Sequence, residues 1–244
     1  MLNKIYIKIL SIIIYFIDMK NKKKIINFFK KKLNKKQLII IDIGAHKGET
    51  ISLFCKNFTI ENILAFEANP IVFKKLEKKI KKGNYKNKIN LFNLGLGDKE
   101  EKKDLSILND SSSSTYNTID EKTEYYKRKK KFLSLFSKNI IQKKILTNVL
   151  PLSKINEVND LRNIDILKID TEGYELNILK GIYQDHFTKI KYIYFEHHYD
   201  LMIKKNYKYS DIKFFLNKNS FYLAFKIKMR FRKTFEYIYE NRNK

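Results

Sequence analysis

Between residues 38 and 94 the chain alternates apolar segments with amphipathic ones, and this alternation limits the possible folds more than any other feature. The apolar segments 38–43, 63–67 and 89–94 are rich in Ile, Leu and Phe, as expected of strands buried on both faces of a parallel sheet. The segments between them repeat apolar residues at helical spacing, and Pro70 stands where a helix can begin without losing a hydrogen bond. This order predicts right-handed βαβ units in an open α/β sheet.

The same pattern returns in the second half of the chain. We expect strands over 165–170, 190–196 and 221–227, with helices ending near Leu179 and covering 211–216. We therefore expect one main domain over residues 38–227. Three other segments depart from the pattern.

A basic insertion over about 97–148 separates the two halves of this domain. It contains the polar run 111–115 and five consecutive cations at 127–131. A helical lid is one interpretation, and a solvated run of charge is the other. Residues 228–244 form a basic, aromatic tail that the sequence alone does not place.

An N-terminal extension over residues 1–37 is apolar at first and then rich in Lys. Its longest uncharged run, Ile9–Ile17, is far shorter than the ~20 residues that span a bilayer, and no small-residue cleavage site follows it. Two interpretations remain. One is a helix that caps the core of the domain, and the other is an amphipathic helix on an anionic membrane, which Lys20 and the run 22–24 would favour.

The charge of the chain and its cysteine content limit which binding partners and which cellular compartment we expect. The chain has 51 Lys and Arg against 26 Asp and Glu, a net charge of +25 that would suit a polyanion. Only five of these cations are Arg, however, the residue that pairs best with phosphates and guanines. The single cysteine, Cys55, excludes an internal disulfide and fits a reducing compartment, so we expect a cytoplasmic protein, peripheral on the inner membrane face under the second interpretation of the N-terminal extension. We expect no metal, because no Cys/His cluster has zinc spacing.

Glycine and acidic residues follow the first two predicted strands, at the edge where open α/β sheets bind ligands. Gly44 and Gly48 allow the backbone to turn and approach a ligand, but their spacing differs from the dinucleotide-binding pattern. Glu67 ends the second strand, 23 residues after Gly44, near the offset at which an acid binds a ribose diol. A nucleoside ligand without pyrophosphate points to S-adenosylmethionine.

Carboxylates and histidines end the fourth and fifth predicted strands. Acids at such a position can stabilise a helix N-terminus or serve a working site. We interpret Asp170 as facing the site, Glu172 as partly functional, and Glu175 as structural. Glu196 ends the fifth strand and is followed by His197 and His198, whose side chains have an ordinary pKa near 6.5 that suits a general base. Of the two we favour His197.

Several motifs in order resemble one enzyme family. They are "IDIGAHKGETISLF", "AFEANP", "NLGLGD", "LPLSKINEV", "LKIDTEGYELNILKG" and "FEHH". Over roughly residues 38–225 the chain resembles the FkbM-type S-adenosylmethionine-dependent methyltransferases, most specifically in the signature from Asp170 to Gly181. The resemblance implies a class I, Rossmann-like doubly wound sheet and methylation of a hydroxyl on a sugar, glycan or related metabolite.

The resemblance also implies roles for individual residues. It places five residues at the methionine end of the cofactor, namely Asp42, Gly44, Ala45, His46 and Gly48. It assigns Glu67 to the ribose, and Asn93 and Leu94 to the neighbourhood of the adenine. It implies that Asp170, Glu172 and the segment Glu196-His197-His198 face the transferred methyl group. The family usually has Asn where this chain has His46.

Two alternatives use the same fold. A nucleic-acid methyltransferase would suit the charge, but enzymes that methylate base amino groups commonly carry an Asn/Asp-Pro-Pro-Tyr-like motif where this chain has Asp170-Thr-Glu-Gly. We therefore expect a sugar or glycan substrate, lipid-linked if the extension binds a membrane, and no nucleic acid. A non-catalytic basic protein that binds membranes or polyanions is the other alternative, and the presence of Gly44, Gly48 and Glu67 argues against it.

Overall fold

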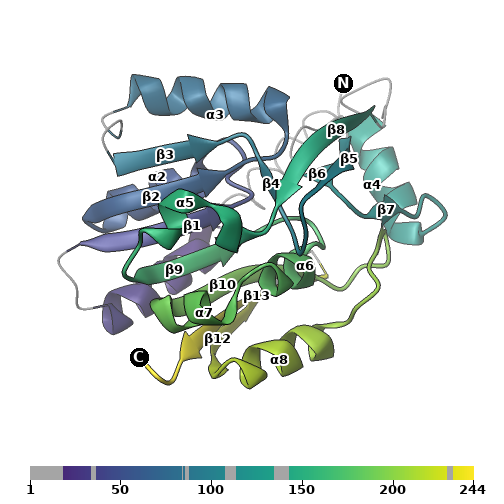
Figure 1. Ribbon diagram of the computed structural model, residues 1–244. Helices are drawn as coiled ribbons and strands as arrows, with labels where there is room; N and C mark the ends of the chain where they lie inside the picture. Colours follow the sequence, from purple (N-terminus) through teal and green to yellow (C-terminus); the bar gives the residue numbers. More distant parts are fainter. Residues whose placement is uncertain are drawn as a thin grey trace.

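The main sheet of the protein has seven strands. The computed structural model describes residues 19–33, 37–83, 85, 88–107, 114–134, 143–229 and 233–244. Within them the strand order is β12-β13-β10-β9-β1-β2-β3 (Figure 1). In that order the strands are Phe221–Lys228, Thr234–Asn241, Ile190–His198, Ile164–Ile169, Leu38–Ile43, Ile60–Phe66 and Ile89–Phe92. The five strands from β10 to β3 run parallel, and β13 is antiparallel to both of its neighbours, which confirms the predicted α/β sheet.

Strand β1 lies at the point where the order of the sheet reverses. It pairs with β2 on one side and with β9 on the other, so the chain fills the sheet outward from β1 in both directions. All six residues of β1 and of β9 are buried, the charged Asp42, Asp165 and Lys168 included, as expected of strands covered on both faces. The carboxyl ends of these two strands border the crevice in which such sheets bind ligands.

Helices cover both faces of the sheet. One face packs against the helix at residues 19–32, α2 (Glu49–Asn57) and α3 (Pro70–Lys82). The other packs against α5 (Asn156–Asn159), α6 (Glu175–Lys180), α7 (Gln184–Lys189) and α8 (Tyr209–Lys218), with the 3-10 turn Leu152–Lys154 before α5. Helix α3 begins at Pro70 as predicted, and the side chain of Asn69 caps it by accepting hydrogen bonds from the amides of Ile71 and Val72.

The helix at residues 19–32 belongs to the core. Ile25, Ile26, Phe29 and Leu33 are buried in the same apolar cluster as β1 and α2. This part of the N-terminal extension therefore packs as the first of the two interpretations expects. Residues 1–18 lie outside the described residues, so contact with a membrane stays a prediction. Among the described helices none is long and apolar enough to cross a membrane.

The expected insertion over residues 97–148 builds a second, smaller sheet beside the crevice. Its strand order is β4-β8-β5-β6, and a separate pair joins β7 to β11. These strands are β4 Gly95–Leu96, β5 Glu101–Ile107, β6 Ser114–Thr115, β7 Thr118–Ile119, β8 Lys143–Leu150 and β11 Ile203–Lys204. The five consecutive cations lie in helix α4 (Glu124–Ser134).

The C-terminal segment is part of the main sheet. We expected the domain to end at residue 227, with a tail over 228–244, whereas the structure places β13 between β10 and β12. Six of its eight residues are buried, and Ile238 and Tyr239 are fully covered. The return of the chain as an antiparallel strand is what brings this segment to the crevice.

Candidate active site

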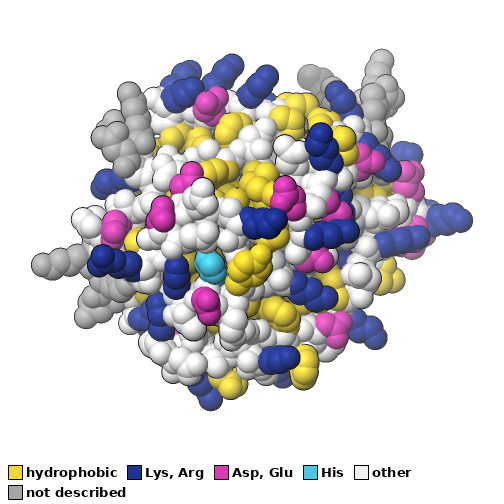
Figure 2. Space-filling view, viewed as in Figure 1, with side chains coloured by type: hydrophobic (Ala, Val, Ile, Leu, Met, Phe, Trp, Pro, Cys, Tyr) yellow, Lys and Arg dark blue, Asp and Glu magenta, His cyan; other side chains and the backbone are white. Residues whose placement is uncertain are grey.

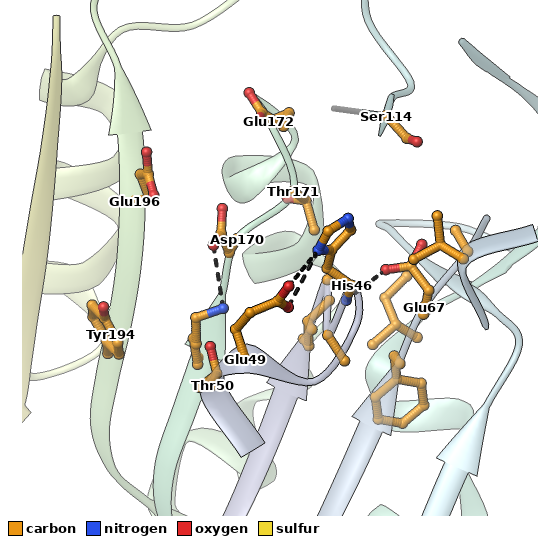
Figure 3. A pocket seen from close by; sticks show the side chains of 18 of the residues that line it. His46, Glu49, Thr50, Glu67, Ser114, Asp170, Thr171, Glu172, Tyr194 and Glu196 are labelled. Carbon is orange, nitrogen blue, oxygen red and sulfur yellow. Dashed lines mark hydrogen bonds and ion pairs between the residues drawn. The ribbon is translucent and has the colours of Figure 1, made fainter. Parts of the chain in front are cut away.

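A pocket of about 290 Å³ opens at the carboxyl ends of β1, β2, β9 and β10 (Figure 3). Asp170 lies in its middle, with Glu196 on one side and His46 and Glu67 on the other. The second sheet adds Ser114 and a neighbouring tyrosine, Tyr116, to the wall. Of the sequence-predicted site residues, those that line the pocket are Gly44, Ala45, His46, Glu67, Leu94, Asp170, Glu172 and Glu196.

The loop after β1 carries three left-handed backbone conformations. Gly44 and Gly48 have φ of 80° and 75°, and His46 has φ of 49°, a region that Asn and His enter more readily than most residues. A Cβ atom at Gly44 would collide with the backbone oxygen of Asp170. Gly44 is therefore required where two loops touch at the pocket floor, while Gly48 precedes α2 and does not line the pocket.

Glu67 is held rigidly at the end of β2. Its Oε2 accepts a hydrogen bond from the amide of His46 at 2.8 Å, and its Oε1 accepts one from the amide of Asn69, also at 2.8 Å. Burial raises the pKa of Glu67 above its ordinary value. Each carboxylate oxygen keeps a further lone pair that can accept a ligand hydroxyl. Asn93, predicted near the adenine, instead donates to the backbone oxygen of Glu67 at 2.8 Å and supports this turn from outside the pocket.

A buried lysine joins two of the predicted acids. Lys168 on β9 places Nζ 3.3 Å from Asp42 Oδ1 and 3.3 Å from Asp170 Oδ2. Burial works to lower the pKa of Lys168, but the two carboxylates outweigh it and raise that pKa. Burial raises the pKa of Asp42, whereas for Asp170 the attraction of Lys168 overcomes burial and lowers the pKa. Asp170 thus faces the pocket in its ionised form. Asp42 is buried outside the pocket lining and pairs with the same lysine.

His198 connects the acids at the ends of β9 and β10. Its Nε2 lies 3.2 Å from Glu172 Oε2 and 3.5 Å from Glu196 Oε1. Burial acts to lower the pKa of His198, yet Glu172 and Asp200 raise it to about 10. The pKa of Glu196 is well above its ordinary value because of burial and of repulsion from Asp170. A positively charged His198 therefore sits beside a carboxyl group that binds protons readily.

His197 is not part of the pocket. Successive side chains of a strand point to opposite faces of the sheet, so His197 points away from the pocket while Glu196 lines it. His197 is buried, with Nδ1 3.4 Å from Oε2 of Glu175 and with tyrosine rings around it. The hypothesis that His197 is the general base is therefore wrong. Glu175 is structural, as expected, since it also accepts hydrogen bonds from the amide of Gly173 and the hydroxyl of Tyr207.

The pocket contains polar residues that sequence reasoning missed. They are Lys22, Glu49, Thr50, Ser114, Tyr116, Lys168, Thr171, Tyr194 and Glu236. A lone lysine within the buried strand 164–169 was a usable signal for Lys168. Glu236 lies in the segment that the sequence did not place. In the described part of the chain no group of three or more His, Cys, Asp and Glu could hold a metal ion.

Comparisons with known proteins agree on the fold. The sequence matches the family model of the methyltransferase FkbM domain over residues 42–223. Among similar solved structures is the methyltransferase FkbM from Methylobacillus flagellatus KT, with 15% identity and a TM-score of 0.52, covering 87% of this chain and 46% of that chain. Another is magnesium protoporphyrin IX methyltransferase from Synechocystis PCC 6803 with bound S-adenosylhomocysteine, with 10% identity and a TM-score of 0.51, covering 93% and 84%.

This chain thus spans about half the length of the Methylobacillus flagellatus protein. No curated protein matches the sequence. The shared architecture is the Rossmann-like fold of class I methyltransferases, as the motifs implied.

Proposed function

The chain belongs to the FkbM methyltransferase family, and we propose that it transfers a methyl group from S-adenosylmethionine to a hydroxyl of a sugar, glycan or related metabolite. One observation carries this proposal. A single pocket combines Glu67 and the glycine loop on one side with Asp170 and Glu196 on the other. The first side suits a nucleoside, and the second suits an acceptor that must lose a proton.

The residues of the first side fit the cofactor. Glu67 presents a carboxylate fixed by two backbone amides, which is the group that binds a ribose diol. Gly44 and Ala45 bring backbone to the pocket wall, and the apolar Phe66 and Leu94 offer a surface for a flat ring. When bound there, S-adenosylmethionine supplies a methyl group on a positively charged sulfur. The ionised Asp170 stands on the acceptor side of the same pocket, where it favours that positive charge.

The acceptor side supplies positioning and a base. Holding the reacting atoms in line can supply roughly 7–11 kcal/mol of the barrier. A hydroxyl is a weak nucleophile until its proton is accepted, and a positioned base contributes roughly 10²–10⁴-fold. Lys168 lowers the pKa of Asp170 and makes it a weak base, whereas the raised pKa of Glu196 makes that carboxylate a stronger one. Glu196 is therefore the better candidate for the base than Asp170.

The charge distribution favours this acceptor class over nucleic acid. Lys and Arg side chains are spread over the face in Figure 2 with Asp and Glu between them, rather than gathered in one basic patch. The pocket itself carries Asp170, Glu172 and Glu196, which would repel the phosphates of a nucleic acid.

A calorimetric titration of S-adenosylmethionine tests the cofactor assignment. We expect Glu67→Ala to weaken binding at least about tenfold, because the ribose loses its carboxylate partner. Glu61→Ala is the matched control, since Glu61 lies on the same strand but is exposed. Absence of binding by a folded wild-type protein would contradict the proposal. If both substitutions weakened S-adenosylmethionine binding equally, Glu67 would have no specific role in binding the ribose.

Transfer of a labelled methyl group to a panel of sugars tests the reaction. We expect Glu196→Gln to lower kcat strongly while the affinity for S-adenosylmethionine stays within about twofold of wild type, because the base acts only in the transition state. An unchanged kcat in this variant would exclude Glu196 as the base.

Peripheral contact with an anionic membrane is a further part of the proposal, and it would bring the enzyme close to lipid-linked glycans. It rests on the basic, apolar composition of the N-terminal extension. Because residues 25–33 belong to the core, the informative truncation removes only residues 1–18. We expect it to weaken sedimentation with phosphatidylserine vesicles, because it removes the apolar part of the extension while Lys20 and the run 22–24 remain. Unchanged sedimentation would contradict membrane binding through this segment.

A further inference from the structure

Glu236 reaches the pocket from outside the region that the family model covers. It lies on β13, beyond residues 42–223. Its side chain is only 5% exposed, and Oε1 accepts a hydrogen bond from the hydroxyl of Tyr194 at 2.9 Å. Oε2 is buried and has no hydrogen-bond partner among the described residues. Glu236 also lines the pocket. Leaving a buried carboxylate oxygen unsatisfied is costly, so this atom is available to a ligand.

Glu236 stands directly opposite Glu196. The two residues are register partners in the antiparallel ladder of β10 and β13, where like charges destabilise a sheet. Burial raises the pKa of both, that of Glu236 to about 7. The charged groups that act on Glu236 from neighbouring elements are Lys168 on β9, Asp170 directly after β9, and Lys22 on the helix at 19–32.

Two carboxyl groups so placed do not ionise together readily, so at least one of them stays protonated near neutral pH. Their free oxygens then offer one hydrogen-bond donor and several acceptors to a ligand. Adjacent hydroxyl groups of a sugar offer the same mixture of donors and acceptors. A phosphate or carboxylate on a ligand would instead meet a second negative charge.

The surrounding charges also disfavour an anionic ligand. The acidic side chains that line the pocket are Glu49, Glu67, Asp170, Glu172, Glu196 and Glu236. The lysines that line it are Lys22 and Lys168. The more buried of these cations, Lys168, is already engaged by Asp42 and Asp170. A chain with a net charge of +25 therefore keeps an acidic reaction pocket.

We propose that Glu196 and Glu236 form a carboxyl pair that binds the methyl acceptor, and that this pair selects neutral hydroxyl compounds with adjacent hydroxyl groups and rejects anionic ones. This inference rests on the proposed methyl transfer and specifies its substrate class. In the reaction a lone pair of the acceptor oxygen forms the new C–O bond as the bond between methyl carbon and sulfur breaks, and its electrons stay on sulfur. The hydroxyl proton passes to the ionised member of the pair and from there to water.

The matched variants are Glu236→Gln and Glu240→Gln. Glu240 lies on the same strand, and like Glu236 it accepts a hydrogen bond from a tyrosine of β10, in its case Tyr192 at 2.6 Å, but it does not line the pocket. The neutral probes are methyl α-D-glucopyranoside, methyl α-D-mannopyranoside and methyl β-D-galactopyranoside. Glucose 6-phosphate and glucuronate are the anionic probes. Binding is followed by saturation-transfer NMR in the presence of S-adenosylhomocysteine, and transfer by labelled methyl groups.

We expect wild type to bind and methylate at least one neutral pyranoside and neither anionic probe. In Glu236→Gln, kcat/KM for that pyranoside should fall at least about tenfold, with the affinity for S-adenosylmethionine within about twofold of wild type. Glu240→Gln should leave both values unchanged.

A preference for an anionic probe, or full activity in Glu236→Gln, would overturn the inference. So would a wild type that binds S-adenosylmethionine but neither binds nor methylates any neutral pyranoside. Failure to bind S-adenosylmethionine at all would contradict the proposed function itself.

Discussion

His197 places Nδ1 3.4 Å from Oε2 of Glu175, on the face of the sheet opposite the pocket. The next residue, His198, places Nε2 3.5 Å from Oε1 of Glu196, an acid that lines the pocket. We predict that His197→Asn lowers the free energy of unfolding by about 1–3 kcal/mol, because buried Glu175 loses a partner, and leaves the affinity for S-adenosylmethionine unchanged. Urea unfolding and calorimetry measure the two quantities.

His198→Asn is the matched variant on the other face, and we expect it to change the reaction instead. Removing the positive charge of His198 disfavours ionised carboxylates nearby and raises the pKa of Glu196 further. The rise of kcat/KM with pH should therefore move to higher pH. A profile that stays in place, or one that moves equally in His197→Asn, would contradict the separation of the two histidines.

Lys168 holds Asp42 and Asp170 together from inside the sheet. We predict that Lys168→Met lowers the free energy of unfolding by about 3–5 kcal/mol, because it leaves buried carboxylates without a counter-charge. The double variant Asp42→Asn/Lys168→Met should recover part of this loss, since Asp42 is the more buried of the two acids. Urea unfolding measures all of these values.

Lys228→Met, at an exposed position on β12, is the control and should stay within about 0.5 kcal/mol of wild type. A Lys168→Met protein as stable as this control would show that the lysine does not stabilise the pair. Absence of any recovery in the double variant would show that Asp42 is not the group left unpaired.

Sequence reasoning predicted the parallel half of the fold because its signal is local. Continuous apolar strands, a helix opening at Pro70 and the glycine loop at 44–48 each depend on a few neighbouring residues. The positions of Glu67 and Asp170 follow from the same logic, since residues after parallel strands meet at one edge of the sheet. The parallel half of the fold and one side of the pocket could therefore be predicted from the sequence alone.

The other half of the pocket depends on contacts that are distant in sequence. The register of β10 against its neighbouring strands decides whether Glu196 or His197 faces the pocket. A shift of one residue would exchange the two faces. Glu236 enters only because β13 returns between β10 and β12, a pairing that no local pattern specifies. Lys168 was overlooked because one of the acids that neutralise it, Asp42, lies on β1 and is distant in sequence.

Gly44 and Gly48 both have left-handed backbones but different neighbours. At Gly44 a Cβ atom would meet the backbone of Asp170, whereas at Gly48 it would meet the terminal methyl of Leu76 at 2.8 Å. We predict that Gly44→Ala costs more than about 3 kcal/mol of unfolding free energy and weakens S-adenosylmethionine binding at least about tenfold, because backbone cannot move aside. Gly48→Ala should cost about 1–2 kcal/mol and bind normally.

Thermal unfolding and calorimetry on the two alanine variants check this difference. Equal losses of cofactor affinity would mean that both glycines approach the ligand, against the placement of Gly48 outside the pocket. A fully stable Gly44→Ala protein would contradict the close contact between the two loops.

The carboxyl group of Glu236 should make the protein less stable as pH rises. Its pKa is raised from 4.5 to about 7 in the folded protein, so between these values the folded state binds a proton that the unfolded state releases. The free energy of unfolding therefore falls as pH rises through this interval, by about 3 kcal/mol for a shift of this size.

Glu236→Gln removes this titration and keeps an oxygen that can accept a hydrogen bond from Tyr194. We predict equal stabilities for wild type and Glu236→Gln near pH 4, and a more stable variant at pH 8, measured by urea unfolding across the range. Glu240→Gln controls for the substitution itself. A difference between Glu236→Gln and wild type that does not grow with pH would show that the pKa of Glu236 is not raised in the folded protein.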